Sequence, residues 1–571
     1  MDPVAYQVVQ SRLSGIVQEM QENIFRTGYS TIIRESQDAS CMLLDAQGDV
    51  IGEHVVLPLH VSCLPEVVRA IVRTFGSDIV PGDAFLTNHP YIGGVPHSMD
   101  MAVVTPFFHD GQLLAFCGSI AHKSDLGGVV PGTGYGSARE LFQEGIQYPP
   151  VRYMRAGTLV SDIEEILRAN SRTPDLILGD IRGQVGVARL GERRLAEMVE
   201  RYGADVAIET FRAKQDVTEA RLRAALAQWP DGESEAEQFI DNDGIVLDRR
   251  VRYHVRVEKR GDRILFDFTG SDDQTLGPVN IRPPLARGCC YYALIGMVDP
   301  ELQNNGGVAR VVETKFRPGS VLDPYFPAAC NTYMASTIAI TEAALRALSA
   351  FAPDRRMAGV GGVGGGAIGG KRTDGTTFVQ YESIGSAYGG RAGVDGVSGI
   401  AVLLSNARSA PVEVLENEFP TRVRRFELIP DSGGAGEFRG GLAPRRVYEV
   451  LAKQAELTLR GGRHEWPAFG RDGGEPGRLG SCTVNPGTAA AKSYPSRFSG
   501  APLTTGDLVA LEKAGGGGLG TPASRPFGKV LDDVLDGYVT RDAAVERYGA
   551  DAERLDRAID EWIGGRETVS A

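Results

Sequence analysis

The stretch His97-Ser-Met-Asp-Met-Ala-Val-Val-Thr-Pro-Phe-Phe-His-Asp-Gly-Gln-Leu-Leu-Ala-Phe-Cys-Gly-Ser-Ile-Ala-His122 contains two apolar segments, 101–104 and 112–116. Short apolar runs bounded by turn residues are typical of β-strands. Between them, His-Asp-Gly at 109–111 has the composition of a hairpin turn, so we expect His109 to be a turn residue. The stretch therefore predicts two neighbouring strands with His and Asp residues near their ends.

The residues on both sides of this stretch predict a first domain that mixes helices with strands. Apolar residues recur at helical spacing in 4–24, and Gly28 is a typical helix stop. The short segments 31–33 and 41–44 are interpreted as strands, because they are apolar and bounded by polar residues. Residues 161–228, rich in Arg and Glu, indicate helices. We expect this domain, with its helices and one sheet, to span 1–230.

Beyond residue 230 the sequence predicts two further domains. A polar segment at 231–238 is interpreted as a linker. Alternation of apolar and polar residues in 251–257 and 264–268 is typical of half-buried antiparallel strands. We therefore predict a β-rich central domain at 239–370 and a C-terminal α/β domain with a helical tail at 371–571. The predicted fold class is α+β with several domains.

Composition excludes several classes of protein. The chain has 571 residues and a net charge of −13, which argues against nucleic-acid binding. No apolar run approaches the roughly 18–20 residues of a membrane span, and the first residues lack a secretory signal. The seven cysteines form no Cys-x-x-Cys pair, as is typical of reduced thiols. We expect a cytoplasmic protein that binds neither nucleic acid nor membrane.

Histidines are concentrated in one part of the chain, since six of the eight lie between residues 54 and 122. His97 and Asp100 are three residues apart and can reach one point from a turn, and His122 can join them from a neighbouring strand. Two imidazoles and one carboxylate leave coordination positions open, which is typical of a catalytic metal site. The alternative is a set of loop histidines that are only hydrogen-bonded or exposed.

Three further residues are candidates for catalysis. His54 and His60 are six apart, so on one strand they would point to the same face and line the same cavity. Packed, hydrogen-bonded histidines would have the same spacing. Asp125 follows His122 and could orient an imidazole or act as a general base. It could equally be an ordinary turn aspartate.

Two glycine tracts imitate phosphate loops. Residues 365–371 have the spacing of such a loop, but Arg372 stands where a Ser or Thr would bind magnesium. The tract 515–520 has no following Lys. We expect neither tract to bind a nucleotide, and we expect both to let the backbone pass close to another chain or to the site.

Several motifs are spread over residues 30–550. They are Ile33–Cys41, Asn88–Asp100, Ala121–Gly128, Glu144–Pro150, Phe266–Ser271, Gly277–Asn280, Asn304–Gly307, Ser405–Arg408, Pro411–Glu413, Gly433–Gly441 and Gly515–Pro522. Together they resemble the hydantoinase B / oxoprolinase family, which is related to the alpha chain of acetone carboxylase and the beta chain of caprolactamase. One departure is His89, which replaces an Asp common in the family. It is either an additional ligand or a pocket-lining residue.

The resemblance implies a function. It implies that His97, Asp100 and His122 hold a divalent transition metal (Zn, Mn or Fe). It implies a hydantoinase A-type ATPase partner that binds ATP and Mg, in a heterotetramer, and it leaves a role for bicarbonate open. The expected reaction is the ATP-dependent opening of a cyclic amide: a hydantoin, an N-methylhydantoin, oxoproline or a lactam. The alternatives are a subunit of a ketone carboxylase and a non-catalytic scaffold for the ATPase.

Overall fold

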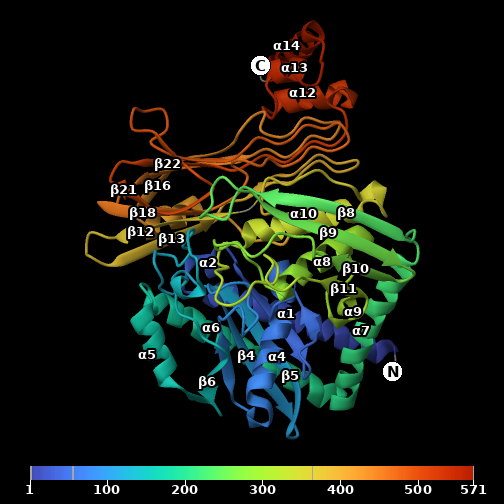
Figure 1. The fold of residues 1–571 in the computed structure, drawn as a ribbon, viewed down its shortest axis with the longest axis vertical. Coiled ribbons are helices and arrows are strands. Elements are labelled where there is room, and N and C mark those ends of the chain that lie inside the picture. The colour runs from blue at the N-terminus through green and yellow to red at the C-terminus, as the bar shows by residue number, and fades with distance from the viewer. Residues whose placement is uncertain (1–2, 55–56, 363, 570–571) are drawn as a thin grey trace.

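The computed structural model describes residues 3–54, 57–362 and 364–569. It confirms an α+β protein of several layers (Figure 1). In the view of Figure 1 the N-terminal sheet and its helices lie at the bottom, a second sheet lies above them on the right, and the C-terminal sheets lie above them on the left. None of the helices in the described part of the chain combines the length and apolarity needed to cross a bilayer.

The N-terminal sheet has the strand order β2-β1-β5-β4-β3-β6-β7. The strands are β1 Ala39–Asp45, β2 Val50–Glu53, β3 Ala84–Thr87, β4 Asp100–His109, β5 Gln112–His122, β6 Val151–Arg155 and β7 Thr158–Leu159. The predicted hairpin is β4–β5, whose turn residues Asp110 and Gly111 both have positive φ angles (49° and 77°). Positive φ at both central positions gives the turn that matches the twist of paired strands. The strands are longer than predicted, because they also include residues that are not strictly apolar.

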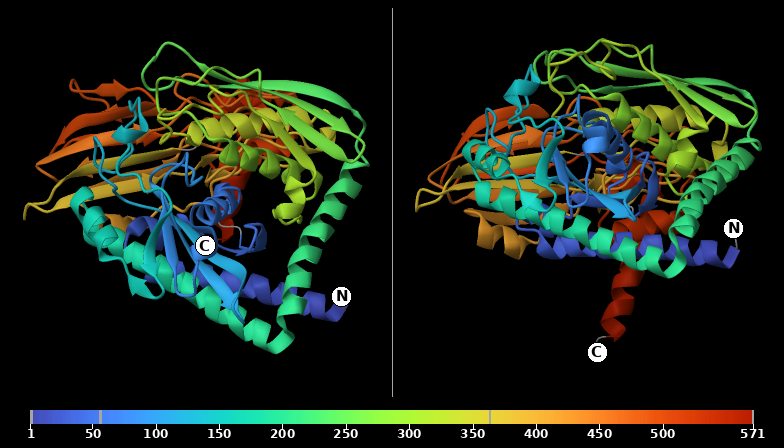
Figure 2. Two further views of the ribbon diagram at one scale, coloured as in Figure 1. Left: turned by 60° about the horizontal axis from the view of Figure 1, so that its bottom comes forward. Right: turned by 90° about the horizontal axis from the view of Figure 1, so that it is seen from below.

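Helices bury both faces of this sheet, which explains why β4 and β5 are apolar rather than alternating. On β5, Phe116 packs in the same cluster as α4 Leu64–Phe75, whereas Cys117 packs in the cluster of α1 Pro3–Thr27 and α6 Pro174–Tyr202. Figure 2 shows α1 and α6 side by side beneath the sheet.

The helices agree with the sequence except in one segment. The first helix ends just before Gly28, as predicted, and the helical region 161–228 contains α5 Ser161–Asn170, α6 and α7 Ala204–Leu226. The strand predicted at 31–33 is wrong, since these residues form the short helix α2 Thr31–Arg34. A run of three apolar residues does not distinguish a buried turn of helix from a strand.

The middle sheet has the order β11-β10-β9-β8. Its strands are β8 Gly232–Ile240, β9 Val251–Arg260, β10 Arg263–Asp267 and β11 Val312–Lys315. The helix α10 Met334–Leu348 packs against β8 and β9, and α8 Pro283–Val298 packs against α10 in the same hydrophobic core. Two short helices, α3 Pro58–Val61 and α9 Gly306–Ala309, lie nearby. Burial alternates along β9, as predicted. The predicted linker at 231–238 is wrong: residues 232–238 belong to β8, whose outer face is polar.

The C-terminal part contains two larger sheets, with strand orders β13-β12-β18-β21 and β16-β17-β22-β19-β20. The elements are β12 Gly365–Lys371, β13 Thr377–Ser383, β14 Ser386–Ala387, β15 Ser398–Ile400, α11 Val412–Glu418, β16 Thr421–Leu428, β17 Pro444–Val450, β18 Gln454–Arg460, β19 Ser481–Val484, β20 Lys492–Tyr494, β21 Arg497–Thr504, β22 Leu508–Glu512, α12 Phe527–Leu535, α13 Arg541–Glu546 and α14 Ala552–Val569. The domain limits near 230 and 370 stay predictions. However, β12 pairs with β13 and β18, so hydrogen bonding crosses the second limit.

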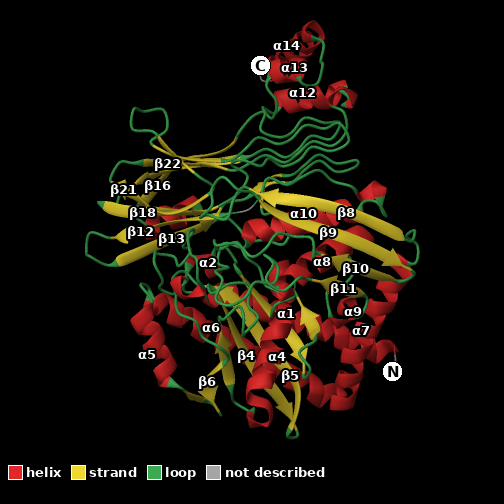
Figure 3. Cartoon of the chain, viewed as in Figure 1, coloured by secondary structure: helices red, strands yellow, loops and turns green. Residues whose placement is uncertain are grey.

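The tract 515–520 lies among extended segments beneath α12 (Figure 3). The amides of Gly515 and Gly518 donate to the carbonyl oxygens of Arg478 and Glu475, which belong to one segment. The amides of Gly516 and Gly517 donate to the carbonyl oxygens of Gly441 and Gly359, which belong to two others. The amide of Gly390 donates to the carbonyl oxygen of Gly517. A strand within a sheet has only two neighbours, whereas this segment is surrounded. A Cβ atom on Gly517 would lie 1.9 Å from the carbonyl oxygen of Phe469, so only glycine fits at this position.

Candidate metal centre

A small cavity lies where the three parts of the chain meet. Its volume is about 30 Å³, which is room for an ion or one or two water molecules. The lining includes Asp38, His97, Asp100 and His122 from the N-terminal part, Asn331 and Tyr333 from the segment before α10, and Gly365, Tyr381, Ser383 and Arg460 from the sheet of β12, β13 and β18.

The β4–β5 hairpin brings together the three predicted metal ligands. Asp100 begins β4 and His122 ends β5, and the two residues are directly paired. His97 Nε2 lies 3.3 Å from Asp100 Oδ1, and His122 Nδ1 lies 3.2 Å from the same oxygen. Ligands that are about 2.0–2.1 Å from an ion are about 3.3–3.4 Å apart in a tetrahedral site and about 2.8–3.0 Å apart in an octahedral one, so this spacing fits a shared ion.

Unpartnered atoms in the same cluster also fit a metal. All three side chains are buried, and ligand atoms from each lie within 4.8 Å of one another. Within the described part of the chain, His97 Nε2, His122 Nε2 and Asp100 Oδ2 have no hydrogen-bond partner. Buried polar atoms are almost always partnered. Orphaned atoms on three residues that are themselves suitable ligands therefore fit a divalent cation.

The charges of the cluster suit metal binding. Burial by itself raises the pKa of Asp100, but the facing imidazoles of His97, His122 and His60 hold it well below its ordinary value. Burial lowers the pKa of His122, so that its ring is neutral near pH 7 although Asp100 opposes this effect. A carboxylate such as Asp100 and a neutral imidazole such as that of His122 are ligand forms that bind a metal without first losing a proton.

Asn331 fixes the orientation of His97. The Nδ1 atom of His97 contacts the backbone and side-chain oxygens of Asn331, at 3.1 and 2.5 Å. The side-chain amide of Asn331 in turn donates to the carbonyl oxygen of Thr133, at 2.8 Å. The Nε2 atom of His97 therefore points to Asp100, and such an outer contact is the usual way to orient a metal-binding histidine.

Asp38 is a site residue that sequence reasoning missed. It lines the cavity just before β1, and its carbonyl oxygen accepts a hydrogen bond from the amide of His122. Burial raises the pKa of the Asp38 carboxyl, and the charge of Asp100 adds to this rise, whereas the imidazoles of His122, His60 and His97 oppose it. The motif Ile33–Cys41 contains Asp38, but no spacing rule connects this residue with a hairpin about 60 residues away.

The two remaining candidate histidines lie in different surroundings. His60 is buried in α3, with Nε2 3.6 Å from Asp100 Oδ2 and Nδ1 bonded to Ser40 Oγ at 3.0 Å. His54 follows β2 and is exposed. The interpretation that both lie on one strand is wrong, because His60 is helical. Of the two, only His60 is brought to the metal ligands.

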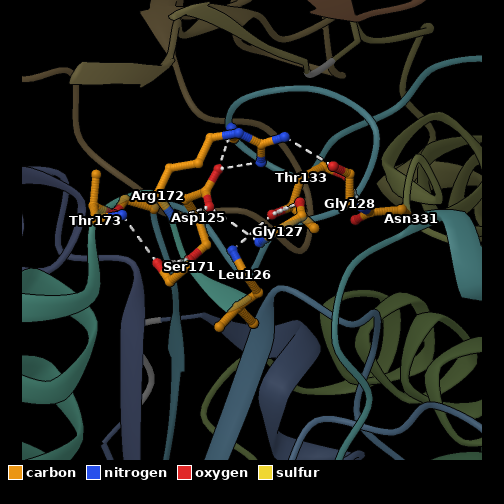
Figure 4. Close-up of polar contacts among 11 residues, drawn as sticks. Asp125, Leu126, Gly127, Gly128, Thr133, Ser171, Arg172, Thr173 and Asn331 are labelled. Atoms are coloured by element: carbon orange, nitrogen blue, oxygen red, sulfur yellow. Dashed lines mark hydrogen bonds and ion pairs between the residues drawn. The ribbon is translucent and has the colours of Figure 1, made fainter. Parts of the chain in front are cut away.

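Asp125 is held away from the cavity by its hydrogen bonds (Figure 4). Its two oxygens accept from the backbone amides of Gly127, Gly132 and Arg172, at 2.9–3.0 Å, and from the Arg172 guanidinium at 3.1 Å. It is not among the residues that line the cavity. Asp125 therefore orders the loop 126–133, whose last residue Thr133 supports Asn331, and it contacts no imidazole directly.

His89 likewise lies outside the metal cluster. Its Nδ1 accepts from the backbone amides of Tyr91 and Ile92, at 3.2 and 3.3 Å, and its ring stacks on Phe326. These contacts fold the loop before His97 and make His89 a structural residue of that loop.

Comparisons with known proteins agree with this architecture. The chain is 30% identical, over 97% of both chains, to a Pseudomonas sp. (strain NS671) protein provisionally named as the B component of a D-/L-hydantoinase. It is 28% identical, over 96% of both chains, to the beta chain of the caprolactamase of Pseudomonas jessenii. The crystal structure of the ATP-dependent caprolactamase from Pseudomonas jessenii matches with a TM-score of 0.89 and 26% identity, over 96% of both chains. The Hydantoinase B/oxoprolinase model matches residues 2–522, and this chain belongs to that family.

Proposed function

We propose that this chain is the metal-binding subunit of an ATP-dependent enzyme that opens a cyclic amide. The main support is the buried set of His97, Asp100 and His122: ligand atoms from the three residues lie within 4.8 Å of one another, and each residue has a polar atom without a hydrogen-bond partner in the described chain. A resonance-stabilised amide resists attack by water, and a bound divalent ion polarises a carbonyl or lowers the pKa of a bound water towards about 7. Relatives named hydantoinase and caprolactamase support the choice of substrate class, a hydantoin or a lactam.

The residues around the ligands have separate roles in this proposal. Asn331 holds His97, and His60 lies against the second oxygen of Asp100. Asp38 is the second carboxyl group in the cavity, and its raised pKa makes it suitable to take a proton from an attacking water. Tyr333 and Tyr381 lie against the rings of His97 and His122 and exclude bulk water.

ATP belongs to a partner in this proposal. Residues 365–371 form β12, a strand paired on both sides, and 515–518 are enclosed by other segments, so neither tract has the geometry of a phosphate loop. Relatives named as subunits support a partner, and we propose an ATPase subunit of the hydantoinase A type, with Mg and ATP, in a heterotetramer. The divalent metal in this chain would be Zn, Mn or Fe, and bicarbonate is a candidate co-substrate.

A ketone carboxylase subunit is the second candidate function. The chain is 26% identical, over 96% of its length and 86% of the relative, to the acetophenone carboxylase delta subunit of Aromatoleum aromaticum. The same metal site could stabilise an enolate that attacks activated CO2. Labelled carbon from bicarbonate in the product would select this reaction, and ring opening without carbon gain would select the hydrolase.

The first experiment is metal analysis of the chain purified with its ATPase partner. We expect about one divalent metal per chain in the wild type, and loss of both metal and ATP-dependent turnover in the double variant His97→Ala/His122→Ala. Hydantoin, oxoproline and caprolactam would be compared as substrates, with and without bicarbonate. No metal in either protein, with turnover unchanged, would leave only the scaffold function.

A further inference from the structure

Arg460 is a buried cation without a carboxylate partner in the described chain. It is the last residue of β18, is 7% exposed and lines the cavity that contains the metal ligands. Its Nη1 donates to the sulfur of Met99 at 3.0 Å, and its Nη2 has no hydrogen-bond partner among the described residues. Thioether sulfur is a weak acceptor, so most of the hydrogen-bonding capacity of this guanidinium is unused.

This situation is unusual for a buried arginine. Removal of a guanidinium from water is costly unless a carboxylate or several strong acceptors replace the water. Arg463 is buried to the same degree and forms an ion pair with Glu342 at 2.6 Å. Arg460 has only the sulfur of Met99 and the ring of Tyr381, whose centroid lies 4.5 Å from its Cζ. An anionic ligand would complete its surroundings.

The neighbouring residues hold Arg460 next to the metal ligands. The Tyr381 ring, which contacts the guanidinium, also stacks on the ring of His122 at 4.9 Å. Two glycines make room for this arrangement. A Cβ atom on Gly365 would lie 2.6 Å from the Tyr381 hydroxyl, and a Cβ atom on Gly134 would lie 2.7 Å from Cδ of Arg460. The backbone on both sides is thus shaped to admit the ring and the cation.

Charge balance favours an anion over a neutral amide. Within the described chain no carboxylate forms an ion pair with Arg460, so its positive charge has no direct counter-charge in the cavity. Burial raises the pKa of the nearby Glu144 to about 8, so this acid does not neutralise the charge at pH 7. A planar guanidinium with free donors suits the oxygens of a phosphate or a carboxylate.

We propose that Arg460 binds an anionic oxygen of the ligand at the metal site, and that this ligand is a phosphorylated or carboxylated carbonyl compound rather than a free neutral amide. This inference rests on the proposed ATP-dependent reaction. Transfer of a phosphoryl group to a carbonyl or to bicarbonate supplies such an oxygen. Arg460 would then select the activated species, and the neutral cyclic amide would bind without its help.

Anion binding tests the proposal directly. Inorganic phosphate, bicarbonate and neutral caprolactam would be titrated into the metal-loaded complex with its partner, by calorimetry and without ATP. We expect Arg460→Met to weaken binding of one anion about 10- to 100-fold, which is the loss of charge-assisted hydrogen bonds, and to leave caprolactam binding unchanged. Arg460→Lys should be intermediate. The control Arg372→Met removes an arginine that lies over Phe378 of β13, outside the cavity. This variant should bind both anions and caprolactam as the wild type does.

Each outcome of the titration either supports or overturns the anion site at Arg460. Loss of phosphate binding alone identifies a phosphorylated ligand, and loss of bicarbonate binding alone identifies a carboxylated one. Equal anion binding by wild type and Arg460→Met, or no anion binding by the wild type, overturns the proposal. If Arg460→Met does not fold, wild-type crystals grown in selenate replace it: an anomalous peak at Arg460 supports the assignment, and its absence overturns it. The titration measures binding alone, so it is independent of the turnover assay for the proposed function. Absence of ring opening in that assay would refute the reaction and still leave Arg460 as an anion site.

Discussion

Asp100 and His122 are directly opposite each other at the open end of the β4–β5 hairpin, with Asp100 Oδ1 3.2 Å from His122 Nδ1. The register of one hairpin therefore sets the distance between two proposed metal ligands. A shift by one residue would turn one of the two side chains to the other face of the sheet. The metal site is thus as rigid as the hairpin.

Asp100→Asn tests whether this carboxylate is a ligand. The amide keeps the shape of the side chain but loses the charge, so we expect metal content to fall at least tenfold, with the fold intact by circular dichroism. Elemental analysis after dialysis against a weak chelator is the measurement. Asp110→Asn, in the exposed turn of the same hairpin, is the control and should retain its metal. Full metal content in Asp100→Asn would exclude Asp100 as a ligand.

Asn331→Ala should weaken metal binding without removing a ligand. His97 would lose the partner of its Nδ1 atom and become free to rotate. Loss of such an outer contact typically costs about 10- to 100-fold in metal affinity. Competition with a fluorescent chelator measures this change. The control Asn417→Ala, at an exposed position, should bind metal as the wild type does. An unchanged metal affinity in Asn331→Ala would show that packing alone orients His97.

Asp125→Ala should lower stability more than catalysis. The variant loses a carboxylate that accepts four hydrogen bonds, three of them from backbone amides, so we expect the free energy of unfolding to fall by about 2–4 kcal/mol in urea titrations. Turnover per metal-loaded molecule should remain within a few-fold of wild type. The control Asp162→Ala, on the exposed side of α5, should change the free energy of unfolding only slightly. A stable but inactive Asp125→Ala would restore this residue as a catalytic base.

Glu144 should make stability depend on pH. Burial raises its pKa to about 8 from an ordinary value of 4.5, so the folded protein holds a proton that the unfolded chain has lost. The contribution of this group is therefore largest below about pH 4.5 and is lost as the pH rises towards 8. Glu144→Gln should show a smaller fall of the thermal midpoint over this window than wild type. Glu165→Gln, on an exposed part of α5, should not change the slope.

Gly517→Ala should prevent correct folding of the C-terminal part. Its Cβ atom would lie 1.9 Å from the backbone oxygen of Phe469, and no flexible side chain can move aside. We expect insoluble protein, or a large decrease in the midpoint temperature of thermal unfolding. Gly186→Ala is the matched control, since nothing lies within 4 Å of its Cβ position in α6. Gly186→Ala should raise the free energy of unfolding by about 0.5–1 kcal/mol. A soluble Gly517→Ala protein of normal stability would contradict the close packing around Gly517.

Local patterns predicted the local part of this molecule. The apolar runs around the turn at 109–111 predicted the hairpin, and the short spacing of His97, Asp100 and His122 predicted three residues that the structure brings together. The alternation in 251–257 predicted β9. In each case the decisive contacts lie within about 25 residues of one another along the chain.

Long-range contacts explain what the sequence did not show. Asp38 and Arg460 reach the cavity from positions more than 400 residues apart, so no period or motif connects them. The interpretation of His54 failed because helix α3, rather than a strand, carries His60. Asp125 has the composition of a catalytic residue, and only its hydrogen-bond partners reveal its structural role.

The origin of the cavity lining has a consequence for synthesis of the chain. The three proposed metal ligands lie within 97–122, whereas Asn331, Tyr381 and Arg460 close the cavity from much later segments. A chain emerging from the ribosome thus completes its metal ligands hundreds of residues before it can enclose them. During that interval any captured ion remains open to exchange with the cell's pool of metals. The identity of the metal can therefore depend on which ion is abundant during translation, as well as on the geometry of the finished site.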